Sequence, residues 1–138
     1  MVGQPRLSFM EAVSKAINGI TDYNTRSRRS ELWFWVLFDF LVSFVIILIL
    51  GLININILTK IGSAIVSIAS FVVALPLAIR RLHDIGKSGW YILIGLIPIV
   101  GAFILLYLYI KDSQMESNDY GPSPKYSNSI GMTSSNMI

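Results

Sequence analysis

The sequence predicts an all-α, polytopic membrane protein in which three transmembrane helices follow a short amphipathic interfacial helix. Two observations predict this fold. Of the 138 residues, 54% are hydrophobic and only 14% are charged, against about 25% charged in soluble domains. The apolar residues also form three long blocks, each close to the roughly 20 residues that a helix needs to cross a bilayer. This composition argues against a soluble globular enzyme and against a disordered chain.

Residues 1–31 form a cytoplasmic segment that we expect to contain the amphipathic helix. Apolar residues recur there at helical spacing, at Phe9, Val13, Ile17 and Ile20. Ser8 and Glu11 have the spacing of a capping box, in which each side chain bonds a free amide at the start of a helix. We expect this helix to lie on the membrane surface. The alternative is a small cap on the cytoplasmic ends of the spans.

The predicted transmembrane bundle covers residues 32–112, with spans at 32–53, 61–79 and 90–110. Asp39 is the only charged residue in the first span, and the other two spans contain none. The third span has Pro98 and Gly101 near its middle. These two residues suggest an alternative in which the segment turns back as a re-entrant hairpin.

The basic residues predict the orientation of the spans, because cytoplasmic loops are enriched in Lys and Arg. Eight of them precede the first span or lie between the second and third, namely Arg6, Lys15, Arg26, Arg28, Arg29, Arg80, Arg81 and Lys87. The other side would hold Lys60, Lys111 and Lys125. The N-terminus is therefore expected in the cytoplasm, and three complete spans would place the C-terminus in the periplasm. A re-entrant third segment would return the C-terminus to the cytoplasm.

Aromatic residues support this orientation, and a polar tail follows the last span. Aromatic rings anchor spans at the membrane interface, and at the cytoplasmic interface we expect this role for Trp33, Trp35, Trp90 and Tyr91. Residues 113–138 are rich in Ser, Asn, Gly and Pro. We expect a polar, partly disordered tail, with disorder over residues 127–138.

The loop at residues 80–90 is the most informative stretch of the sequence. It begins Arg80-Arg81-Leu82-His83-Asp84 and ends Lys87-Ser88-Gly89-Trp90. Arginine binds phosphate through parallel hydrogen bonds. We therefore expect a site for an anion or a lipid headgroup that uses Arg26, Arg29, Arg80, Arg81, Lys87 and Ser88. The alternative is that these residues only set the topology of the chain.

A polar network is expected from Asp39, His83 and Asp84. Asp39 lies about two turns inside the first span, where an ionised carboxylate is costly, so it should be protonated or pair with Arg80, Arg81 or Lys87. We expect Asp84 to pair with an arginine of the loop, and Glu31 to do the same. His83 could titrate near neutral pH.

No metal site and no cofactor is predicted. His83 is the only histidine and the chain has no cysteine, whereas a catalytic metal site usually needs three protein ligands. Gly86-Lys87-Ser88 resembles the end of a phosphate-binding loop, but the glycine that begins such a loop would fall at Arg81. Phosphate hydrolysis by that route is therefore excluded.

The second span carries a face of small residues. They recur at helical spacing, at Ser63, Ser67, Ser70, Ala74 and Ala78. Small residues let helix backbones approach closely. This face therefore predicts a packing seam, either within the chain or between copies in a homo-oligomer.

Three motifs form a specific set over about Tyr23 to Pro124. They are Arg26-x-x-Arg29-x-x-Leu32-Trp33, then Arg80-Arg81-Leu82-His83-Asp84 with Ser88-Gly89-Trp90, and last Asn118-x-Tyr120-Gly121-x-x-Pro124. With Pro98 and Gly101 between them, they resemble the domain-of-unknown-function 805 family of small bacterial inner-membrane proteins. Thr25 and Leu32 depart from the family pattern, in which Gly and Phe are usual. The resemblance implies a polytopic inner-membrane protein and supplies no established activity or catalytic residue.

Three functions are compatible with these features. The first is a non-enzymatic membrane component that binds anionic lipid headgroups or a partner protein through a cytoplasmic face of Arg and Trp. The second is a subunit of an oligomeric small transporter or channel, with Asp39 and His83 near its path. The third is a membrane enzyme that acts on a lipid-linked phosphate. We favour the first, with anionic membrane lipids as partners and no nucleic acid.

Overall fold

The computed structural model describes residues 4–53 and 56–126, and this part of the chain is all-helical, with no strand. Helix α1 spans Phe9–Asn18, α2 spans Arg29–Ile53 and α3 spans Asn56–Asp84. A 3-10 helix, η1, follows at Gly89–Leu96, and α4 spans Val100–Ile110. Residues 127–138, for which the sequence predicts disorder, lie outside the described residues.

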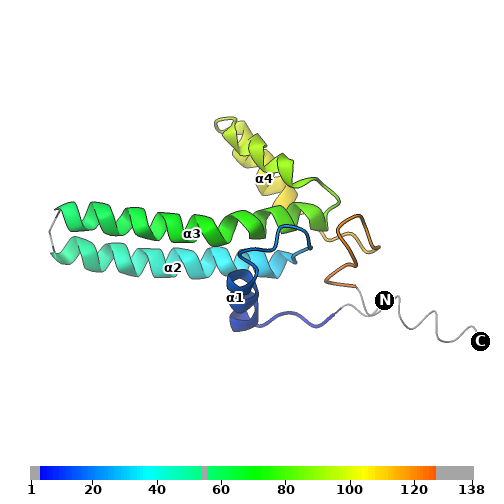
Figure 1. The fold of residues 1–138 in the computed structure, drawn as a ribbon, viewed down its shortest axis with the longest axis horizontal. Coiled ribbons are helices and arrows are strands. Elements are labelled where there is room, and N and C mark those ends of the chain that lie inside the picture. The colour runs from blue at the N-terminus through cyan, green and yellow to red at the C-terminus, as the bar shows by residue number, and fades with distance from the viewer. Residues whose placement is uncertain (1–3, 54–55, 127–138) are drawn as a thin grey trace, which may run out of the picture.

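Helices α2 and α3 lie side by side as a long antiparallel hairpin (Figure 1). At 1.5 Å per residue their 25 and 29 residues are about 37 and 43 Å long, so each exceeds a hydrocarbon core of about 30 Å. Both are apolar enough to cross a membrane, and they contain the predicted spans 32–53 and 61–79. We call the end formed by Arg29 and Asp84 the basic end of the hairpin, and the opposite end the far end.

Helix α3 continues through Arg80–Asp84, which the sequence analysis placed in a loop. The extra turns are stabilised because the side chains of these five residues are buried at the basic end rather than solvated. Arg81 and His83 in the last turn also suit the negative end of the helix dipole. The loop proper is reduced to the residues between Asp84 and η1.

Residues 90–110 do not form the predicted third transmembrane helix. Instead, η1 and α4 form a short helical hairpin that leans away from α3 (Figure 1). Their lengths correspond to about 16 Å each, which is half of a hydrocarbon core. The segment is therefore bent, as the re-entrant alternative requires, and the predicted count of three spans is not confirmed.

The turn between η1 and α4 shows why this segment reverses. Ile99 has a φ of 64°, in the left-handed region that a β-branched residue rarely adopts. The preceding Pro98 has no backbone N–H and cannot extend η1. A side chain at Gly101 would collide with the carbonyl oxygen of Ile94. Glycine at this position therefore lets the two short helices approach each other.

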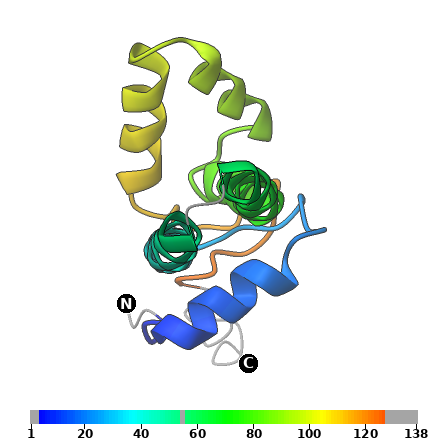
Figure 2. The same cartoon turned by 90° about the vertical axis from the view of Figure 1, so that its left-hand side faces the viewer.

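Helix α1 crosses the basic end of the hairpin on the side opposite η1 and α4 (Figure 2). The predicted capping box is present, with Ser8 N donating to Glu11 at 2.8 Å and Glu11 N to Ser8 Oγ at 3.3 Å. One face of α1 packs into a core formed by Val13, Ala16, Leu32, Trp35 and Leu77. Ile17 and Ile20, expected on that face, are exposed. The contacts with α2 and α3 agree with the alternative in which this helix caps the spans.

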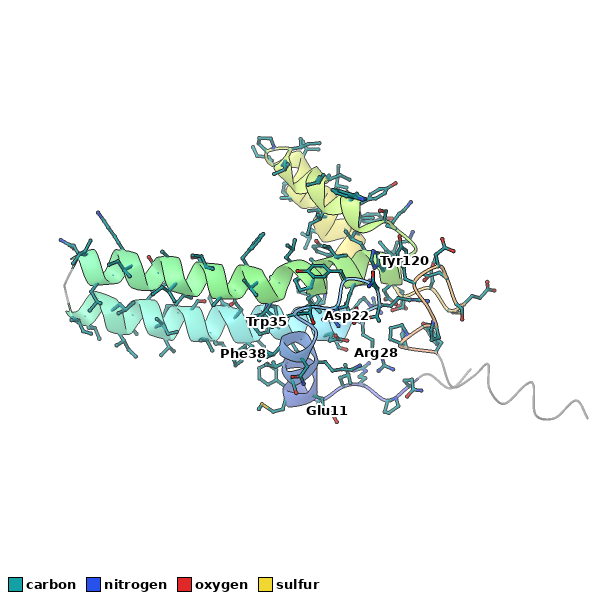
Figure 3. All side chains as sticks on the ribbon, in the orientation of Figure 1. Glu11, Asp22, Arg28, Trp35, Phe38 and Tyr120 are labelled. Atoms are coloured by element: carbon teal, nitrogen blue, oxygen red, sulfur yellow. The ribbon has the colours of Figure 1, made fainter. Side chains whose placement is uncertain are left out.

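Trp35 is not the interfacial anchor that the sequence analysis predicted. Its ring is buried in the core beneath α1, 5.6 Å from the ring of Phe38 (Figure 3). The prediction was wrong because α1 covers the face of α2 that carries Trp35. Trp33, Trp90 and Tyr91 are exposed, as interfacial anchors require.

Candidate functional site

The carboxylate of Asp84 is the centre of a buried cluster at the basic end. It accepts a hydrogen bond from Arg81 Nη1 at 2.6 Å and another from the hydroxyl of Ser113, and it lies 3.2 Å from Arg26 Nε. The three charged side chains are at most 1% exposed. We call Arg26, Arg81, Asp84 and Ser113 the Asp84 cluster. Because two buried cations share one buried anion, other acceptors must complete the hydrogen bonding of the arginines.

Backbone carbonyls of distant segments are those acceptors. Arg26 donates to the carbonyl oxygens of Asp84, Gln114, Glu116 and Gly121 at 2.7 to 3.1 Å. Arg81 donates to the carbonyls of Tyr109 and Lys111. The segment that follows α4 is therefore held against the basic end.

The family motif near residue 120 belongs to the same assembly. Asn118 Nδ2 donates to the carbonyl of His83 at 2.9 Å, and Tyr120 N donates to Asn118 Oδ1 at 2.9 Å. Gly121 has a φ of 107°, which only glycine adopts readily, and its carbonyl faces Arg26. The carbonyl of Pro124 accepts from Arg28 Nε at 2.6 Å. All three sequence motifs thus converge.

Arg80 forms a second buried ion pair. Its Nη1 lies 3.4 Å from Glu31 Oε1, and Lys15 Nζ lies 4.0 Å from the other oxygen of Glu31. The predictions that Asp84 and Glu31 pair with arginines of residues 80–81 are confirmed. Nε and Nη2 of Arg80 have no hydrogen-bond partner in the described part of the chain. The guanidinium lies against Gly19, at the negative end of α1.

The prediction that the arginines form an open anion site is wrong. Arg26, Arg80 and Arg81 are buried, and the anions that they meet are the protein's own Asp84 and Glu31. Arg29 remains partly exposed. Lys87 lies over the ring of Tyr91, 5.3 Å from its centroid, and Ser88 caps η1 by accepting from Trp90 N. The six residues predicted to bind an anion therefore do not form one exposed site.

An open pocket of about 320 Å³ at the start of α2 is lined by four basic residues, Arg6, Arg28, Arg29 and Lys125. We call it the basic pocket. Ser30, at the positive end of the α2 dipole, also lines it, with Phe34 and Leu7 as apolar neighbours. Arg28 is held by the carbonyls of Pro124 and Pro5, each at 2.6 Å (Figure 3). The pocket has the charge and donors that a phosphate group requires.

Asp112 partly neutralises the basic pocket. Its carboxylate lies 3.1 Å from Arg29 and 2.8 Å from Lys125. Although partial burial raises its pKa, the hydrogen bonds from Lys125 and Ser113 N and the charge of Arg29 outweigh burial, so the pKa of Asp112 is lowered. The hydrogen bond to Asp112 raises the pKa of Lys125. Asp112 and Lys125 are therefore both charged at every pH between their two pKa values, and neutral pH lies within this range.

A second pocket, of about 400 Å³, lies between the end of α3 and the start of η1. We call it the aromatic pocket, after Tyr23, His83, Trp90 and Tyr120 in its wall. The rings of His83 and Tyr120 are stacked, with centroids 3.6 Å apart and planes 3° from parallel. His83 Nδ1 lies 3.3 Å from the carbonyl oxygen of Thr25. His83 and Asp84 thus face different sites, and in the part of the chain that the structure describes no hydrogen-bonded network joins them to Asp39.

Of the two alternatives predicted for Asp39, an ion pair or a protonated carboxyl, the ion pair is not formed within the described residues. Its Oδ1 accepts a hydrogen bond from the hydroxyl of Ser70. A groove between α2 and α3 is lined by Asp39 and by the small residues Ser63, Ser67, Ser70 and Ala74. Four of the five small residues therefore face α2 across this groove. Arg80 pairs with Glu31 and Arg81 pairs with Asp84 instead.

Several site residues were missed by the sequence analysis. Asp112 was placed at the end of the transmembrane bundle, Ser113 and Lys125 were assigned to the tail, and Arg28 was counted only as a topology residue. The signal available for the first two was their position immediately after the last apolar segment. Within the described ranges, 4–53 and 56–126, no three His, Asp or Glu side chains gather as metal ligands would.

Comparison with known proteins identifies relatives over most of the chain. A family model described as "Protein of unknown function (DUF805)" matches residues 20–122. "Inner membrane protein YhaI" of Escherichia coli (strain K12) is 30% identical over 117 residues, which cover 85% of this chain and 98% of the relative. "Inner membrane protein YhaH" of the same strain is 29% identical over 126 residues, covering 84% and 98%. No solved structure matches the chain.

Proposed function

The chain belongs to the DUF805 family of unknown function, among bacterial inner-membrane proteins, and we propose that it binds anionic lipid headgroups as a non-enzymatic membrane component. The basic pocket is the observation that carries this proposal. Four basic residues line it, and Asp112 is the carboxylate paired with two of them. On the cytoplasmic leaflet the abundant anion is a lipid headgroup, and each basic residue near it contributes about 1 kcal/mol.

The proposal includes a topology in which the N-terminal segment and residues 111–126 both lie in the cytoplasm. The hydrogen bonds of Arg26 and Arg81 hold the second of these segments at the same end of the hairpin as the first. With η1 and α4 as a half-depth hairpin, ten of the eleven Lys and Arg residues lie on that side, and only Lys60 lies at the far end. This distribution follows the positive-inside rule more closely than the division of eight against three that three full spans would give.

The test is the affinity of the detergent-solubilised full chain for short-chain phosphatidylglycerol, measured by native mass spectrometry. Arg6→Gln with Lys125→Gln should weaken binding roughly 30-fold, because each lost charge contributes about 1 kcal/mol. Asp112→Asn removes a competing anion and should strengthen binding roughly fivefold. Lys60→Gln, the same loss of charge at the far end, is the matched control and should have no effect.

Two comparisons decide the outcome. If Asp112→Asn fails to strengthen binding, and the double variant binds as the unaltered chain does, the basic pocket is not the site. Inorganic phosphate serves as a second probe for the source of the anion. Phosphate that competes at concentrations similar to the lipid would show that the pocket takes a free anion, against the proposal of a lipid.

A further inference from the structure

We propose that the aromatic pocket binds a lipid whose headgroup carries a primary ammonium group. This pocket and the basic pocket share no lining residue, so the inference does not rest on the proposed function. The observations that support it are one available hydrogen-bond acceptor, three aromatic side chains and an apolar wall.

The acceptor is Nε2 of His83. A carbonyl oxygen can only accept, so the 3.3 Å approach of His83 Nδ1 to the oxygen of Thr25 assigns the hydrogen to Nδ1. The neutral ring then presents a lone pair at Nε2. Within residues 4–53 and 56–126 the hydrogen bond of the His83 ring is the one at Nδ1, and Nε2 is not one of the fully buried unpartnered atoms, so it can be reached from the aromatic pocket that His83 lines. A ligand that donates N–H or O–H would satisfy it.

The aromatic side chains favour a cation as that donor. Tyr23, Trp90 and Tyr120 line the pocket together with His83, and a cation is attracted to the faces of such rings. Asp22, which precedes Tyr23, interacts electrostatically with His83 and adds negative potential. Figure 3 shows Asp22 and Tyr120 toward the basic end of the hairpin. A primary ammonium combines positive charge with N–H donors.

The remaining wall favours a lipid over a soluble amine. Ile79, Ile92 and Leu93 form its apolar part, where α3 meets η1. Trp90, at 77% exposed, is placed to lie at the membrane interface. Gly89 keeps the space beside the acceptor open, because a side-chain carbon there would lie 3.3 Å from His83 Nε2 and 2.7 Å from Ile79 Cγ2. Acyl chains can therefore follow the apolar wall while the headgroup reaches His83.

The experiment measures binding of short-chain phosphatidylethanolamine to the detergent-solubilised full chain by native mass spectrometry. Phosphatidylcholine, which has a cation but no N–H, and phosphatidylglycerol, which has no cation, are the comparison lipids. The lipids are compared on the variant with Arg6→Gln and Lys125→Gln, in which phosphatidylglycerol binding to the basic pocket is weakened. In this variant we expect phosphatidylethanolamine to bind at least roughly fivefold more tightly than either. Glycerophosphoethanolamine, the headgroup without acyl chains, should bind far more weakly.

The variants test the contribution of the His83 acceptor to binding separately from that of the aromatic side chains. His83→Phe keeps a ring that can stack on Tyr120 but removes the acceptor, and it should abolish the preference over phosphatidylcholine. Trp90→Leu should weaken binding of phosphatidylethanolamine roughly fivefold, whereas Trp33→Leu, at an exposed tryptophan outside the pocket, should not. Gly89→Ala fills the space beside Nε2 and should weaken binding even if His83→Phe fails to fold.

Each contrary result overturns a stated part of the inference. Equal binding of phosphatidylcholine would exclude His83 as the acceptor. Equal binding of phosphatidylglycerol to the variant with Arg6→Gln and Lys125→Gln would exclude an ammonium ligand. Equal binding of glycerophosphoethanolamine would exclude the lipid. Arg6→Gln with Lys125→Gln should leave phosphatidylethanolamine binding unchanged, so that a failure of the basic pocket and a failure of the aromatic pocket are distinguishable.

Discussion

Asp84→Asn removes the single negative charge that two buried arginines share, and it should be the most destabilising isosteric change at the basic end. The variant leaves Arg26 and Arg81 in place with their carbonyl partners but without the carboxylate. Removing one partner of a buried ion pair costs about 3–5 kcal/mol, because the remaining charge stays desolvated and uncompensated. We expect a loss of unfolding free energy of this size, about 3–5 kcal/mol.

The measurement is chemical unfolding of the full chain in detergent micelles, followed by tryptophan fluorescence. Asp112→Asn is the matched control, because its carboxylate is 48% exposed and its ion pairs should contribute only about 0–1 kcal/mol. Trypsin offers an independent probe, since buried Arg26 and Arg28 become cleavable if the segment after α4 detaches. The reasoning is refuted if Asp84→Asn costs no more than Asp112→Asn and leaves the tryptic pattern unchanged.

Two further predictions concern the re-entrant hairpin and the topology. Gly101→Ala should lower the melting temperature in detergent, because the added methyl group would collide with the carbonyl of Ile94. Gly51→Ala is the control and should not lower the melting temperature as much, because the space around Gly51 is open. Equal effects of the two substitutions would contradict the tight η1–α4 turn. Reporter fusions after Tyr126 should be active in the cytoplasm and inactive in the periplasm, while insertions between Ile53 and Asn56 should show the reverse. Periplasmic activity after Tyr126 would contradict the half-depth hairpin.

The local features of the fold could be predicted well from the sequence. The apolar blocks at 32–53 and 61–79 lie within α2 and α3, and the Ser8–Glu11 capping box begins α1 as expected. These features depend on residues within one helix or one turn. Residues 90–110 satisfied the same length and hydropathy criteria, but Pro98 and the close approach at Gly101 divide them. Hydropathy alone cannot distinguish one span from two half-spans.

The candidate site was predicted only in part. The sequence indicated that Asp84 and Glu31 pair with arginines, and this is confirmed. It did not indicate that Arg26, Arg80 and Arg81 are buried, nor that Arg28 and Lys125 line an open pocket. Which arginine is exposed depends on what packs over it, and here α1 and the segment after α4 cover three of them.

A helical membrane protein with a basic, aromatic end could be predicted from the residue pattern alone, because insertion depends on the hydropathy of contiguous residues. Which charges neutralise one another, and which face a pocket, became evident only from the folded arrangement of the segments. Arg26 bonds Asp84, 58 residues away, and Gly121, 95 residues away. No local pattern encodes such pairings, since the free energy of a buried charge depends on every segment that excludes water from it.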